Sequence, residues 1–212
     1  MNLLPAPRHL VQTGGTLNLP DSCDIALVAP RAGDVLFSAE RLKTALAIHA
    51  GVEAFLSGGD FTAPIKLVVD PSYGHVQGYR LTIDDERVVV AGNDLAGVFY
   101  GVCTLIQIVQ LNGRTLPHLT IDDYPDLLHR VVMLDISRDK VPKMSTLYHI
   151  VDLLAGMKVN QFQLYTEHTF AYRKHKQVWE TASPMTAGEV LALDAYCHQR
   201  HIELVPNQNS FG

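Results

Sequence analysis

The sequence predicts an α+β domain with an antiparallel sheet and two helices, followed by an incomplete (β/α)8 TIM barrel of about three strands. Three observations support this fold class. Up to about residue 120, short strands accompany two amphipathic helices, whereas from His129 onward strand and helix alternate regularly. Between these parts, residues 121–126 form an acidic, proline-containing run that is typical of a linker. We therefore expect domains over residues 1–122 and 126–212.

The composition excludes several classes of protein. Of the 212 residues, 47% are hydrophobic and 18% are charged, which indicates a packed core rather than a disordered chain. The net charge of −5 favours neither nucleic acid nor a membrane surface as a partner. The N-terminus lacks a signal-peptide pattern, and no apolar run approaches the roughly 20 residues of a membrane span. We expect a cytoplasmic protein with free thiols at its 3 cysteines.

The first domain is predicted from turn residues and hydrophobic periodicity. Gly14-Gly15 and Asp84-Asp85-Glu86 mark turns between apolar runs, and Asp94 is a typical N-cap for the helix that follows it. The expected elements are two strands within residues 11–30, a helix over 35–50, a strand over 65–69, a hairpin over 78–91 and a helix over 95–111. Together they form one sheet with two helices.

The strand from His129 to Arg138 organises the second domain. It is apolar almost to its end, which is typical of a parallel strand covered on both faces. Asp135 and Arg138 lie at its C-terminal end, where charges are costly unless they are paired or face a ligand. The remaining expected elements are a helix over 144–158, a strand over 160–165, a helix from the capping box at 186–189 to about 200, and a strand over 202–205.

The second domain is expected to contain parallel strands, because helices connect them through right-handed crossovers. A complete (β/α)8 barrel needs roughly 250 residues. Residues 126–212 hold only three predicted strands, so we expect less than half a barrel. Its two unpaired strand edges favour self-association of the fragment.

Several segments, taken in order, carry a resemblance to a known family. They are Gln77 to Leu81, Gly97 to Gln107, His129 to Arg138, Asp152 to Asn160 and His201 to Pro206. This series resembles glycoside hydrolase family 20, the β-N-acetylhexosaminidases. The first two segments are similar to the small domain that precedes the barrel of that family. The others resemble its first three barrel strands and the helix between the first two.

The resemblance implies an exo-acting glycosidase that removes terminal β-linked N-acetylglucosamine or N-acetylgalactosamine. It implies a retaining reaction in which the 2-acetamido oxygen of the substrate attacks C1, without an enzyme nucleophile. The family's catalytic Asp-Glu pair follows a fourth barrel strand, which we expect this chain to lack. We therefore assign no catalytic residue and expect the chain alone to be inactive. The implied partner is a carbohydrate, and no cofactor is implied.

Arg138 matches the family arginine that binds hydroxyls of the terminal sugar. A guanidinium suits this role because its fork of donors can engage two adjacent oxygens. The alternative is a structural ion pair between Arg138 and Asp135 or Asp139. In the first interpretation, Asp135 supports Arg138 at the site.

The segment 165–170 departs from the family pattern, which is His-Leu-Ser/Thr-Asp-Asp followed by Gln-Gly-Trp. Glu167 could replace an acid that supports the catalytic Glu, and His168 could face the substrate. The alternative is that both residues lie on a solvated loop. The lost tryptophan leaves three candidates for an aromatic wall, which are Phe170, Tyr172 and Trp179.

Asn207 and Asn209 fall where the family has Glu and Asp. Their amides can hydrogen-bond a sugar but cannot ionise. In the family a Gly-His pair follows, and this sequence ends at Gly212, so we expect a truncation there. His198 and His201 are typical of surface residues rather than of a metal site, and we expect no metal.

Two other functions remain open from the sequence. The first is a non-catalytic carbohydrate-binding or interaction protein that has lost the catalytic half. The second is a family 20-like glycosidase with a different sugar specificity, because segment 165–170 is atypical.

Overall fold

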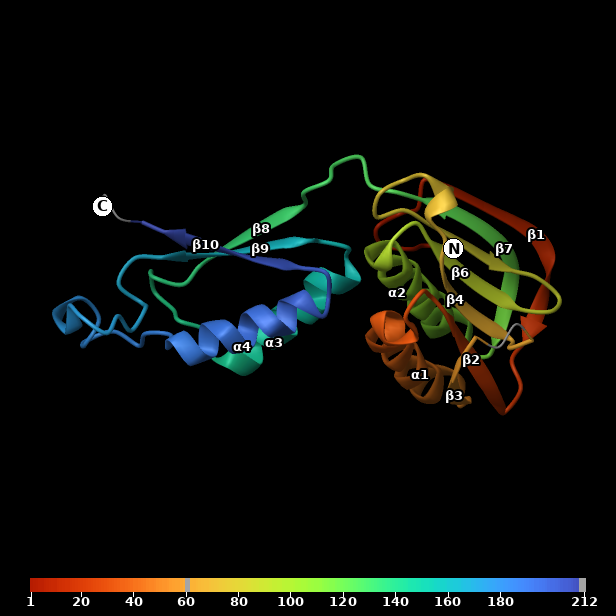
Figure 1. The fold of residues 1–212 in the computed structure, drawn as a ribbon, viewed down its shortest axis with the longest axis horizontal. Coiled ribbons are helices and arrows are strands. Elements are labelled where there is room, and N and C mark those ends of the chain that lie inside the picture. The colour runs from red at the N-terminus through yellow and green to blue at the C-terminus, as the bar shows by residue number, and fades with distance from the viewer. Residues whose placement is uncertain (60–61, 210–212) are drawn as a thin grey trace. The chain divides into compact units, whose positions relative to one another are not determined.

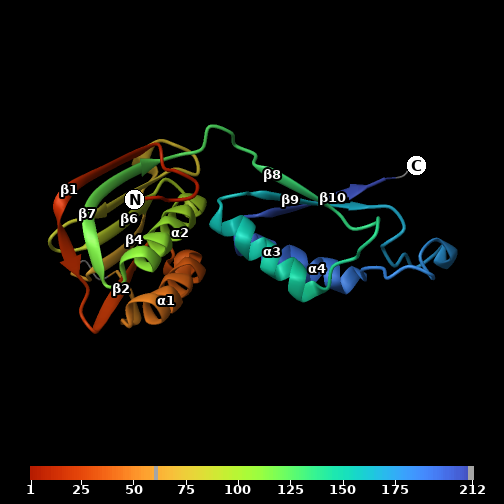
Figure 2. The same ribbon diagram turned by 180° about the vertical axis from the view of Figure 1, so that it is seen from behind.

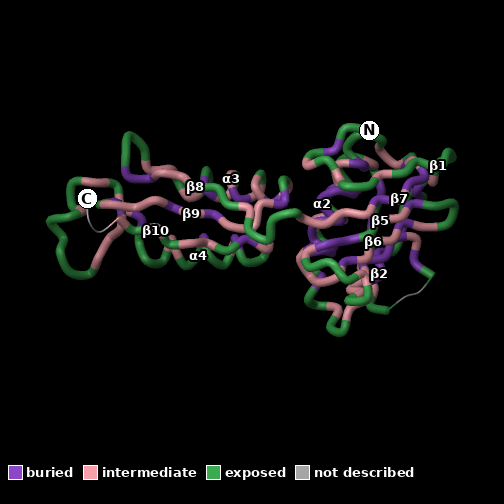
Figure 3. Tube along the Cα trace, turned by 90° about the horizontal axis from the view of Figure 1, so that it is seen from above, coloured by how far each residue is buried: buried purple, intermediate pink, exposed green. Residues whose placement is uncertain are grey.

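The computed structural model describes residues 1–59 and 62–209. The chain divides into two compact units, Met1–Leu128 and His129–Gly212 (Figure 1). Figure 3 shows buried residues concentrated in α2 and the sheet of the first unit, whereas the second unit is exposed along much of its chain.

The first unit is a seven-stranded sheet with two helices on one face (Figures 1 and 2). Its elements are β1 (His9–Asn18), β2 (Ser22–Val28), α1 (Leu36–Ala50), β3 (Glu53–Gly58), β4 (Ile65–Val69), β5 (Tyr79–Ile83), β6 (Val88–Gly92), α2 (Leu95–Asn112) and β7 (Thr115–Asp123). The strand order is β1-β7-β5-β6-β4-β2-β3. Both predicted helices and the β5–β6 hairpin are therefore confirmed.

The prediction of an antiparallel sheet is wrong, because the sheet is mixed. The β2–β3, β2–β4 and β4–β6 pairs are parallel, whereas β1, β7, β5 and β6 pair with one another in antiparallel fashion. The physical reason is α1, which connects β2 to β3 as a crossover and so returns the chain in the same direction. The sequence prediction also omitted β3 and β7. Residues 121–123, predicted as linker, instead complete β7.

Helix α2 approaches the sheet closely. Its N-cap is confirmed, since the Asp94 side chain accepts the N–H of Gly97 at 2.8 Å. A Cβ at Gly97 would clash with the carbonyl oxygen of Gly78, and one at Gly101 would lie 2.5 Å from Cγ1 of Val90. Only glycine permits this contact between helix and sheet. By length and composition α2 could also cross a membrane, but 61% of it is buried inside the unit, as in a core helix.

The second unit is a three-stranded parallel sheet, as predicted. Its elements are β8 (Val131–Asp135), α3 (Met144–Gly156), β9 (Gln161–Thr166), α4 (Ala187–His198) and β10 (Glu203–Gln208), and the strand order is β10-β9-β8. Both helices lie on the same face of the sheet (Figures 1 and 2). The capping box is confirmed, because Thr186 and Glu189 each accept the backbone N–H of the other.

Strand β8 is not covered on both faces, contrary to the prediction from its apolar run. Val131, Val132 and Met133 are 46%, 37% and 56% exposed. The reason is that β8 is an edge strand, and α3 and α4 cover only one face of the sheet. The central strand β9 buries Phe162 and Leu164 instead.

The three cysteines are free and buried, as the sequence predicted. Burial raises the pKa of the Cys23 thiol to about 11 and that of Cys197 to about 12. The thiols of Cys23 and Cys197 therefore remain protonated and unreactive near neutral pH.

We predict that Gly97→Ala destabilises the first unit by about 1–3 kcal/mol, because the added methyl group forces α2 away from Gly78. Chemical denaturation followed by circular dichroism measures this change. The control is Gly33→Ala, where a Cβ meets open space. A Gly97→Ala variant as stable as the wild type would contradict the close contact.

Candidate functional site

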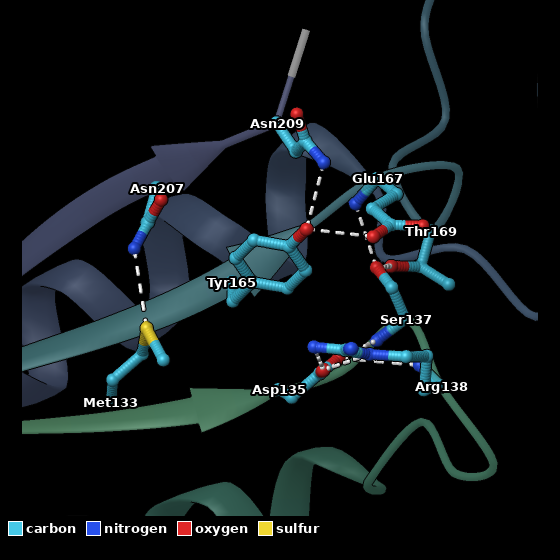
Figure 4. A network of polar contacts seen from close by, with 9 residues as sticks. All are labelled: Met133, Asp135, Ser137, Arg138, Tyr165, Glu167, Thr169, Asn207 and Asn209. Atoms are coloured by element: carbon cyan, nitrogen blue, oxygen red, sulfur yellow. Dashed lines mark hydrogen bonds and ion pairs between the residues drawn. The ribbon is translucent and has the colours of Figure 1, made fainter. Parts of the chain in front are cut away.

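Polar side chains at the carboxyl ends of the three parallel strands form a connected cluster (Figure 4). The strand-end cluster consists of Asp135, Ser137, Arg138, Tyr165, Glu167, Thr169 and Asn209. Parallel strands bring their carboxyl ends to the same edge of a sheet. The register pairs Asp135 with Tyr165, which sets the level of the cluster.

Asp135 holds Arg138 in place. One oxygen of Asp135, Oδ1, accepts the backbone N–H groups of Ser137 at 2.9 Å and of Arg138 at 3.2 Å. The other oxygen, Oδ2, accepts hydrogen bonds from Nε and Nη2 of Arg138. The hydrogen bond from the N–H of Ser137 is the main cause that holds the pKa of the Asp135 carboxyl below its usual value, and Arg138 lowers this pKa further.

The structural ion pair that the sequence left as an alternative is thus present. The Arg138 side chain nevertheless stays 67% exposed. Interaction with Asp135 raises the pKa of Arg138, which keeps the guanidinium charged. The ion pair therefore does not use up the guanidinium, because an arginine can be oriented by a carboxylate and still present donors to solvent.

Tyr165 connects the three strands. Its hydroxyl donates to Oε1 of Glu167 at 2.7 Å and accepts from Nδ2 of Asn209 at 2.8 Å. The guanidinium carbon of Arg138 lies 5.3 Å from the centroid of the Tyr165 ring, within cation–π range. The hydrogen bond to Glu167 raises the pKa of Tyr165. This residue therefore links three of the predicted site residues.

Two buried hydroxyl groups fix the backbone at Glu167. Ser137 Oγ accepts the backbone N–H of Glu167 at 2.7 Å and lies 3.0 Å from Oγ1 of Thr169. Both hydroxyl residues are buried. The position of the Glu167 backbone is therefore set by the end of β8 as well as by β9.

Two predicted site residues lie outside the strand-end cluster. The exposed His168 lines a hollow with Asp139 and Lys140, which adjoins the cluster because Ser137 and Thr169 also line it. Asn207 pairs with Tyr165 in the strand register, but its side chain is directed away from the cluster, and its Nδ2 donates to Oε1 of Gln163 at 3.2 Å. Figure 4 shows the Asn207 amide directed at Met133 rather than at the Tyr165 hydroxyl. Gly212, which carried the truncation argument, lies outside the described residues.

Sequence reasoning missed three members of the cluster, which are Ser137, Tyr165 and Thr169. Tyr165 had a usable signal, because polar Gln161, Gln163 and Tyr165 alternate with apolar Phe162 and Leu164 along one strand. This period of two places Tyr165 on the face away from the helices. Ser137 and Thr169 follow strands, and no local pattern distinguishes them from ordinary loop residues.

Two of the aromatic candidates line a groove between α4 and the β9–β10 strands. Phe170 and Tyr172 pack edge to face with ring centroids 4.9 Å apart. They line this groove of about 470 Å³ together with Leu191 of α4 and Pro206 of β10. Trp179 supports them, as its Nε1 donates to the carbonyl oxygen of Tyr172 at 3.0 Å.

Neither a metal centre nor a catalytic acid pair is evident in the part of the chain that the structure describes. No group of three or more His, Cys, Asp or Glu side chains there could hold a metal ion. The sequence contains one adjacent Asp-Glu pair, Asp85-Glu86. This pair lies in the turn between β5 and β6, where Glu86 pairs with Arg87 at 2.5 Å. It is therefore far along the chain from the strand-end cluster.

Comparison with known proteins decides the family. The sequence profile "Glycosyl hydrolase family 20, domain 2" matches residues 1–124. The chain belongs to glycosyl hydrolase family 20. The matched region ends within a few residues of the last strand of the first unit, and the second unit follows it.

Relatives within family 20 are similar over most of this chain. The β-hexosaminidase of Porphyromonas gingivalis is 25% identical over 224 residues, which cover 95% of this chain and 28% of that protein. The N,N'-diacetylchitobiase of Vibrio harveyi is 29% identical over 167 residues, which cover 77% of this chain and 18% of that protein. The chain thus spans less than a third of the length of either relative.

Solved structures of family 20 share the fold. An N-acetyl-β-hexosaminidase of Streptomyces plicatus, solved with thio-NAglucal, matches 96% of this chain and 45% of its own at a TM-score of 0.80 and 24% identity. A chitobiase of Flavobacterium johnsoniae matches 96% of this chain and 34% of its own at a TM-score of 0.78 and 23% identity.

We predict that the Asp135 carboxylate stabilises this family 20 chain fully above about pH 4 and progressively less below it. The folded-state pKa lies below the unfolded value of about 3.9, so the stabilisation is present above that value and is lost as pH falls through the folded pKa. Asp135→Asn should therefore lower the unfolding temperature at pH 7, and the difference from wild type should shrink below pH 4.

Thermal unfolding between pH 3 and pH 7 measures this effect. Asp139→Asn is the control, since this neighbouring exposed carboxylate lies outside the strand-end cluster. A difference for Asp135→Asn that is equally large at pH 3 and pH 7 would show that its charge is not responsible.

Proposed function

We propose that this chain forms part of an exo-acting β-N-acetylhexosaminidase, which hydrolyses terminal β-linked N-acetylglucosamine or N-acetylgalactosamine with retention. The observation that carries the proposal is Arg138, which is charged, oriented by Asp135 and 67% exposed in a family 20 chain. The names of the relatives, β-hexosaminidase and N,N'-diacetylchitobiase, support this substrate class.

The second unit is proposed to supply the first three strands of a (β/α)8 barrel, in a domain that begins near residue 126. Two features support this arrangement. The strands are adjacent in chain order and parallel, and both helices lie on one face. A doubly wound sheet would place helices on both faces, because its strand order reverses. The open face would then become the barrel interior.

In the proposed site, Arg138 donates hydrogen bonds to hydroxyl groups of the terminal sugar. Asp135 fixes the guanidinium through Oδ2 and so reduces the ordering cost of binding. Glu167 accepts a hydrogen bond from the Tyr165 hydroxyl at 2.7 Å, which places a carboxylate acceptor at the same strand ends. Its proposed role is to support the general acid, and Asn209 orients Tyr165. His168 and Asn207 are proposed as peripheral substrate contacts.

The proposed reaction is substrate-assisted. The 2-acetamido oxygen attacks C1 while a general acid protonates the glycosidic oxygen, and the resulting cyclic intermediate is opened by water with retention at C1. An Asp-Glu pair would orient the acetamide and transfer the proton. The described ends of β8, β9 and β10 hold no such pair, so it would come from chain beyond these 212 residues.

We predict turnover of a chromogenic N-acetyl-β-glucosaminide by a gene product extended to the length of the relatives, and essentially none by the 212-residue chain. In the extended protein, Arg138→Ala should lower kcat/KM about 10- to 100-fold, because hydrogen bonds from a charged donor contribute about 1.5–3 kcal/mol. Arg173→Ala is the control, as this arginine is exposed in the same unit.

Two results would overturn these assignments. Equal turnover by the 212-residue chain would show that no further catalytic residues are needed. Unchanged kcat/KM in Arg138→Ala would remove Arg138 from the substrate site. Sugar binding without turnover by the extended protein would instead favour a non-catalytic carbohydrate-binding protein.

A second candidate is a family 20-like glycosidase with a different sugar specificity. It is favoured by the atypical segment 165–170. Tyr165 and Glu167 lie at the strand ends in the segment that replaces the family pattern His-Leu-Ser/Thr-Asp-Asp. Assays of the extended protein on aryl β-N-acetylhexosaminides, β-glucosides and β-glucuronides distinguish the two candidates. A clear preference for the hexosaminides would reject the second one.

We predict that the 212-residue chain self-associates in solution. Strands β8 and β10 are the edges of the second unit's sheet, and β8 exposes Val131, Val132 and Met133. Multi-angle light scattering between about 1 and 100 μM should show a mass that rises with concentration. A single species of 23.4 kDa at all concentrations would contradict this prediction.

A further inference from the structure

The first unit has a polar cleft on the sheet face opposite its helices. The cleft has a volume of about 530 Å³, within the range of roughly 300–1,000 Å³ that is typical of small-molecule sites. Its floor crosses four strands, because His9 pairs in register with Asp122, Asp122 with Arg80, and Arg80 with Ala91. Tyr79 is buried against α2, so the next residue, Arg80, lies on the open face.

Aromatic rings form the walls of this cleft. Tyr73 stands at the end of a short 3-10 turn, and His75 stacks on Tyr124 with ring centroids 3.9 Å apart and planes 3° from parallel. The turn is held from both sides. Asp70 Oδ1 accepts the N–H of Ser72 at 3.0 Å, and the N–H of Asp70 donates to the Gly92 carbonyl at 2.8 Å. These hydrogen bonds hold the wall at Tyr73 in place, which lowers the entropic cost of binding.

The floor offers both donors and acceptors. Arg80 donates from Nε to Oδ1 of Asp122 at 2.7 Å, and its side chain remains 56% exposed. A guanidinium has five N–H donors, so this bond leaves others for a ligand. Burial, followed by the charge of Asp122, raises the pKa of Tyr73 to about 12, which keeps its hydroxyl protonated. Asp70 and Asp122 supply acceptor oxygens.

The charges of the lining narrow the class of ligand. Two carboxylates, Asp70 and Asp122, outnumber the one guanidinium of Arg80, which disfavours phosphate and other anions. An apolar ligand would have to desolvate the same charges without replacing their hydrogen bonds. A neutral ligand rich in hydroxyl groups satisfies both donors and acceptors.

We propose that this cleft binds a neutral saccharide, as a carbohydrate site in the first unit that is separate from the strand-end cluster. The choice of an N-acetylglucosamine oligomer as the probe rests on the proposed function, whereas the saccharide class rests on the cleft itself. For a polymeric substrate, a second sugar contact would raise the effective concentration of chain ends at the enzyme.

Isothermal titration calorimetry of the 212-residue chain with the tetramer of β-1,4-linked N-acetylglucosamine tests the proposal, with cellotetraose as a second probe. We expect binding of at least one probe with a Kd of about 1 mM or tighter. Arg80→Gln should weaken it about 10-fold or more, and Tyr73→Ala should weaken it similarly. Circular dichroism verifies that each variant is folded.

Two control variants locate the sugar. Arg87→Gln changes a half-buried arginine in the β5–β6 turn of the same unit, and Arg138→Ala changes the strand-end cluster. Binding that persists in Arg87→Gln but weakens in Arg80→Gln and Tyr73→Ala supports the cleft, whatever Arg138→Ala does to sugar bound at the strand-end cluster. Three results would overturn the proposal. They are binding that is lost only in Arg138→Ala, binding that is unchanged in both Arg80→Gln and Tyr73→Ala, and no binding of either probe to the wild type. Hydrolysis by the extended protein is measured separately, so either proposal can fail alone.

Discussion

The parallel pairing of β9 with both of its neighbours is the constraint on which the second unit depends. Phe162 and Leu164 of β9 are buried beneath the helices, so the alternate residues Gln163 and Tyr165 must lie on the opposite face. A shift of register by one residue would exchange these two sets. The apolar packing on one side of the strand therefore fixes where Tyr165 lies on the other side.

This arrangement makes the site a product of sheet geometry rather than of one sequence motif. Asp135, Glu167 and Asn209 follow different strands, and the Tyr165 hydroxyl joins two of them. Arg138 is oriented within its own turn by Asp135, and its guanidinium also lies over the Tyr165 ring of β9. The charged donor is thus positioned mainly by a local ion pair, whereas the shared hydroxyl depends on strand pairing.

The sequence predicted elements whose signals are local. Helix caps at Asp94 and Thr186, the hairpin turn at Asp84 and the apolar stripes of the helices each lie within a few residues. The same reasoning failed for β7, because its acidic end, Asp122 and Asp123, runs into a proline-containing segment and together they resemble a linker. In the structure Asp123 is instead an acceptor for the buried hydroxyl of Tyr79, which lies 44 positions earlier. No local pattern reports such a pairing.

The site shows the same division between local and distant information. Asp135 and Arg138 were predicted together because they are three residues apart, and they form an ion pair. The link from Asn209 to Tyr165 depends on strand register, so sequence spacing could not indicate it. The exposure of β8 likewise depends on which strand is at the edge of the sheet, and an apolar run gives no information about its neighbours.

The close approach of α2 to its sheet has a consequence for divergence among related chains. Gly92, Gly97 and Gly101 occur where a Cβ would meet backbone or a packed side chain. A related protein that keeps this distance between helix and sheet must keep residues without side chains at these places, whatever changes around them. The spacing of these glycines would then outlast most other sequence similarity, and it offers a marker for aligning distant copies of this domain.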